Sequence, residues 1–181
     1  MIKNKEDYRR YLEADKRNLK VSSTLRSYFF NDVWIYQKRL RRAEYYNNCS
    51  KNVIMKVITR IMYLRKGRQL GFSIPLNTFS EGLSIAHYGT IAVNGKARIG
   101  SNCRIHACVN IGASATDSSC APKIGNNCYI GPGAKLFGGI QLGDNVSVGA
   151  NAVVNKSFPD DVILAGIPAK IIANRKLNRS I

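Results

Sequence analysis

A six-residue pattern of apolar and polar positions fills the central part of the chain, residues 93–155. A large apolar residue heads each hexad, and a small or apolar residue follows four positions later. The heads are Val93, Ile99, Ile105, Ile111, Ile124, Ile130, Leu136, Leu142, Val148 and Val154, and the later positions include Ala97, Cys103, Val109, Ala115, Cys128 and Ala134. Both positions point to one side of an extended chain, whereas a helix would scatter them around its axis. The pattern therefore predicts short strands joined by corners and stacked into ladders.

Two intervals break the period. The heads Phe79, Ile85 and Ile91 lie two residues out of phase with the hexads that follow, which predicts a bulge or turn near Gly89. The interval after Ile111 is thirteen residues instead of twelve and is rich in polar residues. An extra loop on a regular coil predicts a functional excursion, with a harmless insertion as the alternative.

The first seventy residues follow a helical pattern instead. Asn4 is a suitable cap for a first helix. A second helix is predicted over residues 34–47, with Trp34 and Leu40 on its apolar side and Arg41 among the basic residues of a solvated side. Aromatic and basic residues alternate there, but ordinary helix packing explains them without nucleic acid.

A third helix is predicted over residues 51–68, and it has the clearest apolar face. That face comprises Val53, Ile54, Val57, Ile58, Ile61 and Met62, with Lys56 and Arg60 opposite. We expect the face to pack on the other helices or on the end of the strand stack. The alternative is a basic amphipathic helix that makes weak contact with an anionic membrane surface.

Composition adds a strong and uneven charge. The net charge of the 181 residues is +17, with 18 Lys/Arg against 6 Asp/Glu in residues 1–70 and 10 against 5 in the remainder. This bias suits an anionic partner without choosing one, and no nucleic-acid partner is expected. The five cysteines form no C-x-x-C pair, and the N-terminus lacks an apolar secretory core. We therefore expect reduced thiols and a cytoplasmic protein.

Candidate chemistry centres on the two histidines, His87 and His106, which are nineteen residues apart, or about one coil. They should therefore lie on one side of the stack in adjacent layers. The motifs of metallohydrolases, triad hydrolases and P-loop proteins are missing, so these classes lack support, and no metal is expected.

The hexads I-G-S-N-C-R, I-G-N-N-C-Y, I-G-P-G-A-K and V-G-A-N-A-V, with the closing A-G-I-P-A-K, resemble those of the hexapeptide-repeat acyltransferases. The segment H-Y-G-T-I-A-V-N that begins at His87 is similar to the active-site segment of the serine acetyltransferase branch. The resemblance implies a mainly β fold, a left-handed parallel β-helix of residues 71–173, behind a basic α-helical region of residues 1–70 and before a basic tail of residues 174–181. It also implies a homotrimer, and pairing of two trimers stays open.

The same resemblance implies roles for individual residues. His87 would be the general base, because an imidazole near its ordinary pKa of about 6.5 is mostly neutral at pH 7 and can accept a proton. The acceptor side would comprise Ala86, Tyr88, His106, Asp117 and Ala121. Acetyl-CoA would lie along Ala113, Pro132 and Ala150, with Lys170 near its phosphates.

Two departures from the serine enzymes bear on the acceptor. The acceptor-binding Asp of that branch is Ala86 here, and its Arg-His pair is Cys120-Ala121. Loss of these charged groups predicts a sugar or glycan-type acceptor, as for the polysaccharide-cluster O-acetyltransferases that the chain also resembles. Two alternatives remain: serine O-acetylation for cysteine synthesis, and a non-catalytic solenoid that only binds. His87 would be oriented either by a backbone carbonyl or by an acid such as Glu81 or Asp117.

Overall fold

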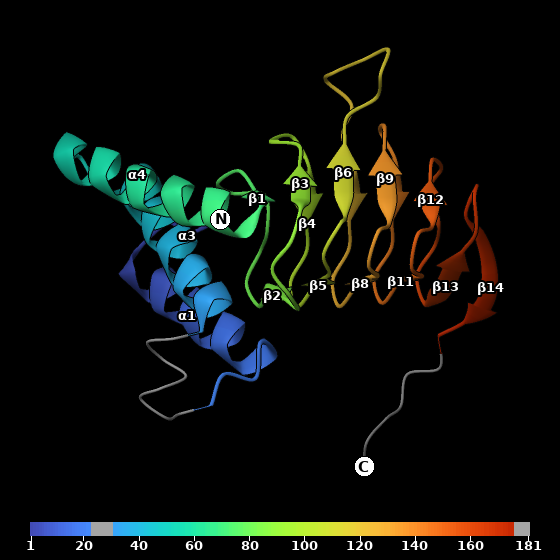
Figure 1. Cartoon of the computed structure of the whole chain (residues 1–181), viewed down its shortest axis with the longest axis horizontal. Helices are drawn as coiled ribbons and strands as arrows, with labels where there is room; N and C mark the ends of the chain where they lie inside the picture. Colours follow the sequence, from blue (N-terminus) through green and yellow to red (C-terminus); the bar gives the residue numbers. More distant parts are fainter. Residues whose placement is uncertain (23–30, 176–181) are drawn as a thin grey trace.

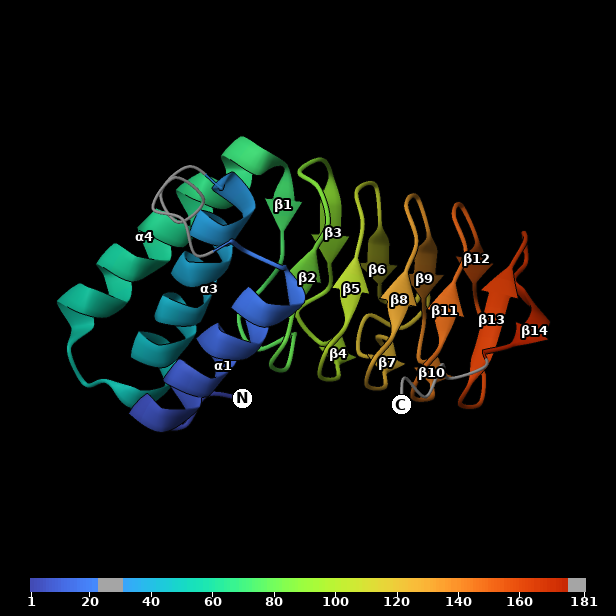
Figure 2. The same cartoon turned by 90° about the horizontal axis from the view of Figure 1, so that it is seen from below.

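The structure is a computed structural model that describes residues 1–22 and 31–175 (Figure 1). Among the described residues, three helices form one end of the molecule, and a stack of short strands extends from them (Figure 2). The helices are α1 (Lys5–Asn18), α3 (Asp32–Cys49) and α4 (Val53–Leu70). The predicted bounds of the second and third helices, 34–47 and 51–68, each differ from the observed bounds by two residues. Most of the predicted basic tail, residues 174–181, lies outside the described residues.

An asparagine side chain begins each of these helices. Its oxygen accepts a hydrogen bond from a backbone N–H three residues later, which satisfies one of the free donors of the first turn. The pairs are Asn4 with Asp7 at 2.8 Å, Asn31 with Trp34 at 3.0 Å and Asn52 with Met55 at 3.0 Å. The predicted cap at Asn4 is confirmed.

The strands of the described residues are short and nearly all parallel. They are β1 (Phe72–Ser73), β2 (Ser84–Ile85), β3 (Ile91–Val93), β4 (Arg98–Ile99), β5 (Arg104–Ile105), β6 (Asn110–Gly112), β7 (Lys123–Ile124), β8 (Tyr129–Ile130), β9 (Lys135–Phe137), β10 (Gln141–Leu142), β11 (Ser147–Val148), β12 (Val153–Val154), β13 (Val162–Ala165) and β14 (Lys170–Asn174). The antiparallel pair is β13 with β14.

Three sheets form the sides of the stack. Their strand orders are β1-β3-β6-β9-β12, β10-β7-β4 and β14-β13-β11-β8-β5-β2. The chain visits the sheets in turn, so each strand pairs with strands one coil away; β5, for example, pairs with β2 on one side and β8 on the other. Parallel strands related in this way need a long connection, which here is the rest of the coil.

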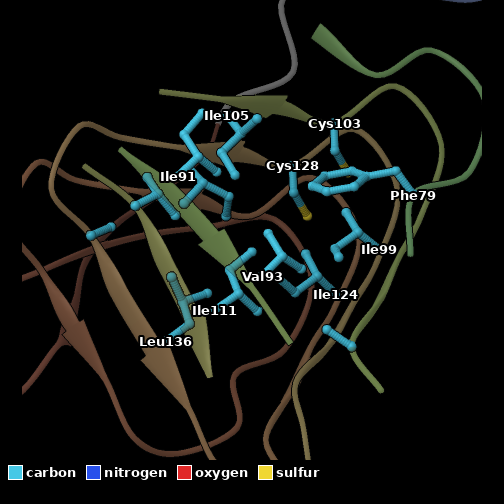
Figure 3. Packing of buried hydrophobic residues seen from close by; sticks show 14 of the residues in the cluster. Phe79, Ile91, Val93, Ile99, Cys103, Ile105, Ile111, Ile124, Cys128 and Leu136 are labelled. Atoms are coloured by element: carbon cyan, nitrogen blue, oxygen red, sulfur yellow. The ribbon is translucent and has the colours of Figure 1, made fainter. Parts of the chain in front are cut away.

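The hexad heads line the interior of the stack (Figure 3). Ile105, Ile130 and Val148 are at most 1% exposed, and the small positions Cys103 and Cys128 are 1% exposed. Isoleucine above isoleucine in successive coils buries branched apolar side chains that pack well on a pleated surface. The predicted inward positions are confirmed, apart from one in the interval after Ile111.

That interval is an insertion at a single corner. The chain takes six residues from Val93 to Ile99 between the same two sheets, but thirteen from Ile111 to Ile124. The expected extra hexad does not form, and Ala115 is exposed. The counting was wrong because thirteen residues resemble two hexads plus one, whereas the structure has one hexad plus a loop.

The helices close one end of the stack through a buried ion cluster. Arg41 was expected on a solvated face, but it is 0% exposed and pairs with Asp15 and Glu44, both at 2.9 Å. It also donates to the carbonyl oxygens of Phe79 at 2.9 Å and Ser80 at 2.6 Å. Burial alone would lower the pKa of Arg41, but the two carboxylates outweigh it and raise the pKa. These bonds satisfy backbone groups of the first coil.

The face of α4 that we expected to be buried is exposed. Its side chains are 38–71% exposed: Val53, Ile54, Val57, Ile58, Ile61 and Met62. The helix packs instead through Thr59, Tyr63, Gly67 and Leu70. A Cβ at Gly67 would lie 2.9 Å from the Phe72 carbonyl oxygen, so glycine permits this close contact. The interpretation that the apolar face packs on the protein is therefore wrong.

In the described part of the chain, no helix combines the length and the apolar character that crossing a membrane requires.

Candidate active site

Both histidines lie on one edge of the stack, where the chain passes from the six-stranded to the five-stranded sheet. His87 follows β2, His106 follows β5, and Pro132 and Ala150 follow β8 and β11. Backbone hydrogen bonds join these turns from coil to coil: Ala86 N–H to Ile105 O at 3.0 Å, Gly133 N–H to Ala107 O at 3.0 Å and Asn151 N–H to Pro132 O at 2.9 Å. Four residues that the sequence analysis predicted for the site, His87, His106, Pro132 and Ala150, therefore lie along this edge. We refer to it as the histidine edge.

The turn that carries His87 has two more residues than its neighbours. Ile85 to Val93 takes eight residues where a regular step takes six. Gly89 has φ +136, and a Cβ there would lie 3.1 Å from the Ala107 side chain. Its N–H donates to the Leu70 carbonyl oxygen at 3.0 Å, which fixes the turn against the end of α4. The predicted bulge near Gly89 is confirmed, and it leaves His87 exposed.

His106 faces His87 across one coil step. The ring centroids are 6.3 Å apart, and the other side of the His106 ring packs on Tyr129 at 4.9 Å. Burial lowers the pKa of His106, and the charges of Arg104 and His87 lower it further. Arg104 Nε donates to His106 Nε2 at 3.4 Å. Because Arg104 occupies the nitrogen that would accept a proton, His87 is the better placed base of the two.

Arg104 was missed by the sequence analysis. It lies on the six-stranded sheet between Ser84 and Tyr129, and its Nη1 donates to the Ser84 hydroxyl at 3.2 Å. Neither of its side-chain partners carries a carboxylate, so the guanidinium can bind an anion beside the histidines. The register of the hexads could have identified it, because it lies one residue before the head Ile105, as Ser84 lies one before Ile85.

The predicted site residues at the insertion, which are Asp117 and Ala121 on the acceptor side and Ala113 for acetyl-CoA, lie away from the histidine edge in a single chain. Ala113, Asp117 and Ala121 belong to the loop that follows β6, at the top of Figure 1. The histidine edge instead precedes the strands of the same five-stranded sheet. Within one chain a strand therefore separates this loop from the turn of His87, and the acceptor-side roles of Asp117 and Ala121 stay predictions.

The bonds of Asp117 stabilise its own loop. Its carboxylate accepts hydrogen bonds from the Cys120 thiol at 2.9 Å and from the Ser119 N–H at 2.7 Å. These bonds lower its pKa to about 2. Glu81, the other acid considered for orienting His87, pairs with Arg10 of α1 at 2.7 Å. Neither acid is shown in contact with His87.

The remaining predicted residues are distributed along the histidine edge. Tyr88 is 70% exposed beside His87, and Ala86 is half-buried. Pro132 and Ala150 are exposed two and three coils further on. Lys170 begins β14 after the turn that follows β13. That turn lies four coil steps from His87, or about 19 Å at ordinary strand spacing. An extended ligand could therefore lie along this edge.

A metal centre finds no support in the geometry. Across residues 1–22 and 31–175 no group of three or more His, Cys, Asp or Glu side chains could hold a metal ion.

Comparison with known proteins gives related sequences. Residues 121–156 match the family described as bacterial transferase hexapeptide (six repeats). A serine acetyltransferase of Synechococcus elongatus is 31% identical over 140 residues, which cover 77% of this chain and 52% of that protein. One of Staphylococcus xylosus is 29% identical over 170 residues, which cover 93% of this chain and 76% of that protein. The chain thus spans about half the length of the first relative.

A solved structure agrees with these relatives. The crystal structure of serine acetyltransferase from Brucella abortus superimposes with a TM-score of 0.75 at 25% identity, covering 95% of this chain and 71% of that one. The resemblance noted in the sequence is confirmed. The prediction of a sugar or glycan-type acceptor, and of a role in polysaccharide biosynthesis, is wrong, because these relatives are named serine acetyltransferases.

Proposed function

The chain is a member of the hexapeptide-repeat acyltransferases, in their serine acetyltransferase-like branch, and on this premise we propose that it transfers the acetyl group of acetyl-CoA to the hydroxyl of serine. The observation that carries the proposal is the placement of an exposed His87 opposite His106, 6.3 Å between ring centroids, at the start of the histidine edge. The similarity to serine acetyltransferases supports the choice of acceptor.

His87 acts as the general base. Its neutral imidazole accepts the proton of the serine hydroxyl as that oxygen attacks the thioester carbonyl carbon. The tetrahedral intermediate then expels the CoA thiolate, to which His87 returns the proton. The products are O-acetylserine and CoA, and no covalent acetyl-enzyme forms. His106, held by Arg104 and Tyr129, forms the wall opposite His87.

Arg104 binds the serine carboxylate. The branch supplies a cation for this purpose at the position of Cys120, which carries none here. Arg104 places a guanidinium next to His106 from the start of β5, the strand that His106 follows. A bidentate arginine-carboxylate pair is strong and directional, so it compensates for the lost group. This assignment also explains why Ala86 and Ala121 need not carry charge on the acceptor side.

Acetyl-CoA lies along the histidine edge. The exposed turns at Pro132 and Ala150 allow close approach of the pantetheine arm, and Lys170 is near the phosphates at the far end. In this arrangement, Ala113 in the loop of a neighbouring subunit contacts the same acetyl-CoA. A donor made in the cytoplasm fits the predicted cytoplasmic location, which stays a prediction.

The proposed assembly is a homotrimer of left-handed β-helices, with residues 71–173 as the transferase unit. The handedness rests on the family resemblance. His87 is exposed, and the loop of Asp117 follows β6 of the five-stranded sheet, whereas the histidine edge precedes the strands of that sheet. In the proposed trimer, the loop of a neighbouring subunit therefore covers the side of His87 that a single chain leaves exposed. Pairing of two trimers is not part of this proposal.

The test is product formation by the purified full chain. Incubation with acetyl-CoA and serine should release free CoA and give O-acetylserine, identified by mass spectrometry. Omission of serine should reduce CoA release to the hydrolytic background. If CoA binds but no acetylserine forms, the acceptor assignment fails; if CoA does not bind, the enzyme assignment fails as well.

A further inference from the structure

The exposed face of α4 is the largest feature that the proposed function does not use. Six apolar side chains are on one side of the helix over about three turns, and the three most exposed, Ile54, Val53 and Ile61, are 71%, 69% and 57% exposed. The opposite side packs through Thr59, Tyr63 and Leu70. Contiguous exposed apolar surface of this kind marks a contact site.

The charge around this face is of one sign. Residues 51–70 contain six Lys or Arg and no Asp or Glu. Arg60, Arg65 and Arg68 are exposed, and in the described part of the chain none of the three belongs to an ion pair. Lys66 pairs with Asp32 at 2.6 Å. The apolar face therefore borders a field of positive charge that the protein itself does not neutralise.

The positive surface continues onto α3. A groove of about 380 Å³ between the helices is lined by Lys38, Arg39 and Arg42 together with apolar Ile35 and Met62. Burial and the charge of Arg39 lower the pKa of Lys38. A concave site lined by both cations and apolar side chains matches a phosphate headgroup joined to an acyl chain.

We propose that this face of α4, with the adjoining groove, docks the protein on the surface of an anionic phospholipid bilayer. The apolar side chains enter the boundary between headgroups and acyl chains, and the arginines bind lipid phosphates. A helix that lies on the surface needs neither the length nor the apolar character of a membrane span.

Two other occupants fit this face less well, one because of the charge of the face and the other because of its aliphatic side chains. A second copy of the chain would bring two helices of the same positive sign together without any acid on either. Single-stranded nucleic acid would use the cations, but it also stacks its bases on aromatic side chains, whereas the exposed face of α4 has none. A bilayer uses both the apolar side chains and the cations.

The test is co-sedimentation of the full chain with vesicles, without acetyl-CoA. Phosphatidylglycerol vesicles should bind the protein and phosphatidylcholine vesicles should not. Binding should weaken by on the order of 10-fold between about 0.1 M and about 0.5 M salt, because the charges are exposed. Val57→Asp with Ile61→Asp should weaken it at least ~10-fold, and Arg60→Gln with Arg65→Gln by on the order of 10-fold.

Matched controls separate this role from net charge and from folding. Lys123→Gln with Lys156→Gln removes two cations from the strand stack and should leave binding within about two-fold. Circular dichroism should show wild-type helix content in every variant, because all the changed side chains on α4 are exposed. Equal losses in the control and α4 variants would overturn the proposal. Absence of vesicle binding by the wild type would also overturn the proposal. Binding of a single-stranded oligonucleotide would then indicate a nucleic-acid partner, and a lower assembly mass for Val57→Asp with Ile61→Asp would indicate a contact between copies of the chain.

Discussion

Arg104 distinguishes the roles of the two histidines. Its Nε donates to the free nitrogen of His106, and its charge, after burial, lowers the pKa of that ring. His87 has the exposed ring of the pair. The nineteen-residue spacing predicted that the histidines would be close, because one coil returns the chain to the same side. Nothing in the spacing predicts the direction of the Arg104 side chain, which depends on its hydrogen bonds.

Arg104→Gln should raise the pKa of His106. In the wild type the positive charge of Arg104 disfavours the imidazolium form of His106. Without that charge, the protonated ring should persist to higher pH. Burial is the larger cause and remains, so the pKa should stay below the ordinary value. NMR titration of the ring resonances measures this, with Arg98→Gln on another sheet as the control. An unchanged midpoint of the His106 titration would show that Arg104 does not act on this ring, and it would contradict the proposed carboxylate site.

Arg41→Ala should destabilise the fold by about 3–5 kcal/mol, because it leaves two buried carboxylates without their partner. Urea unfolding measures the change. Arg42→Ala, one residue along on the exposed side of α3, should cost no more than about 1 kcal/mol. A loss below about 1 kcal/mol for Arg41→Ala would contradict the role given to the cluster.

The elements differ in how far the sequence predicts them. The hexads predict the strands, because each head must point inward in every coil, and the cap at Asn4 predicts the start of the first helix. The starts of the other two helices were each misplaced by two residues. The insertion at Ala115 was miscounted, because a loop carries no period. The apolar face of α4 was identified, but amphipathicity shows only which face is apolar and not what covers it. Arg41 was misplaced since a buried arginine needs partners that are distant in the sequence.

Gly89→Ala tests the element that presents His87. The added Cβ would meet the Ala107 side chain at 3.1 Å in a backbone conformation that side chains rarely adopt. The expected cost is on the order of 1–3 kcal/mol, with lower turnover as the turn shifts. Gly95→Ala should be nearly neutral, because its nearest neighbours lie 3.8 Å away. Thermal unfolding and CoA release are the two measurements. A Gly89 variant as stable and active as the Gly95 variant would refute this account of the turn.

At the level of the whole molecule, the sequence predicted the stack and the order of helices before strands. Handedness and subunit number depend on the resemblance, because the period is the same for either hand. The separation of the histidine edge from the loop of Asp117 within one chain is seen only in the three-dimensional structure. Each is at a different end of the five-stranded sheet, which is the reason for proposing a shared site.

The shared site predicts complementation between inactive subunits. His87→Ala lacks the base, and a chain without residues 114–119 lacks the loop, so each alone should be inactive. Mixed trimers formed by co-expression should recover a measurable fraction of wild-type turnover, because some sites join an intact His87 to an intact loop. Light scattering should give three chains per particle. A fully active monomer would exclude the arrangement.

The most direct test of the central claim is the turnover number with serine at saturating acetyl-CoA for His87→Ala beside Gln141→Ala. Gln141 is exposed on the three-stranded sheet, away from the histidine edge. If His87 removes the hydroxyl proton, its replacement should lower turnover by ~10²-fold or more, and the Gln141 variant should match the wild type. A His87→Ala enzyme that acetylates serine at a near-normal rate would show that the base lies elsewhere and that the histidine edge is not the site of transfer.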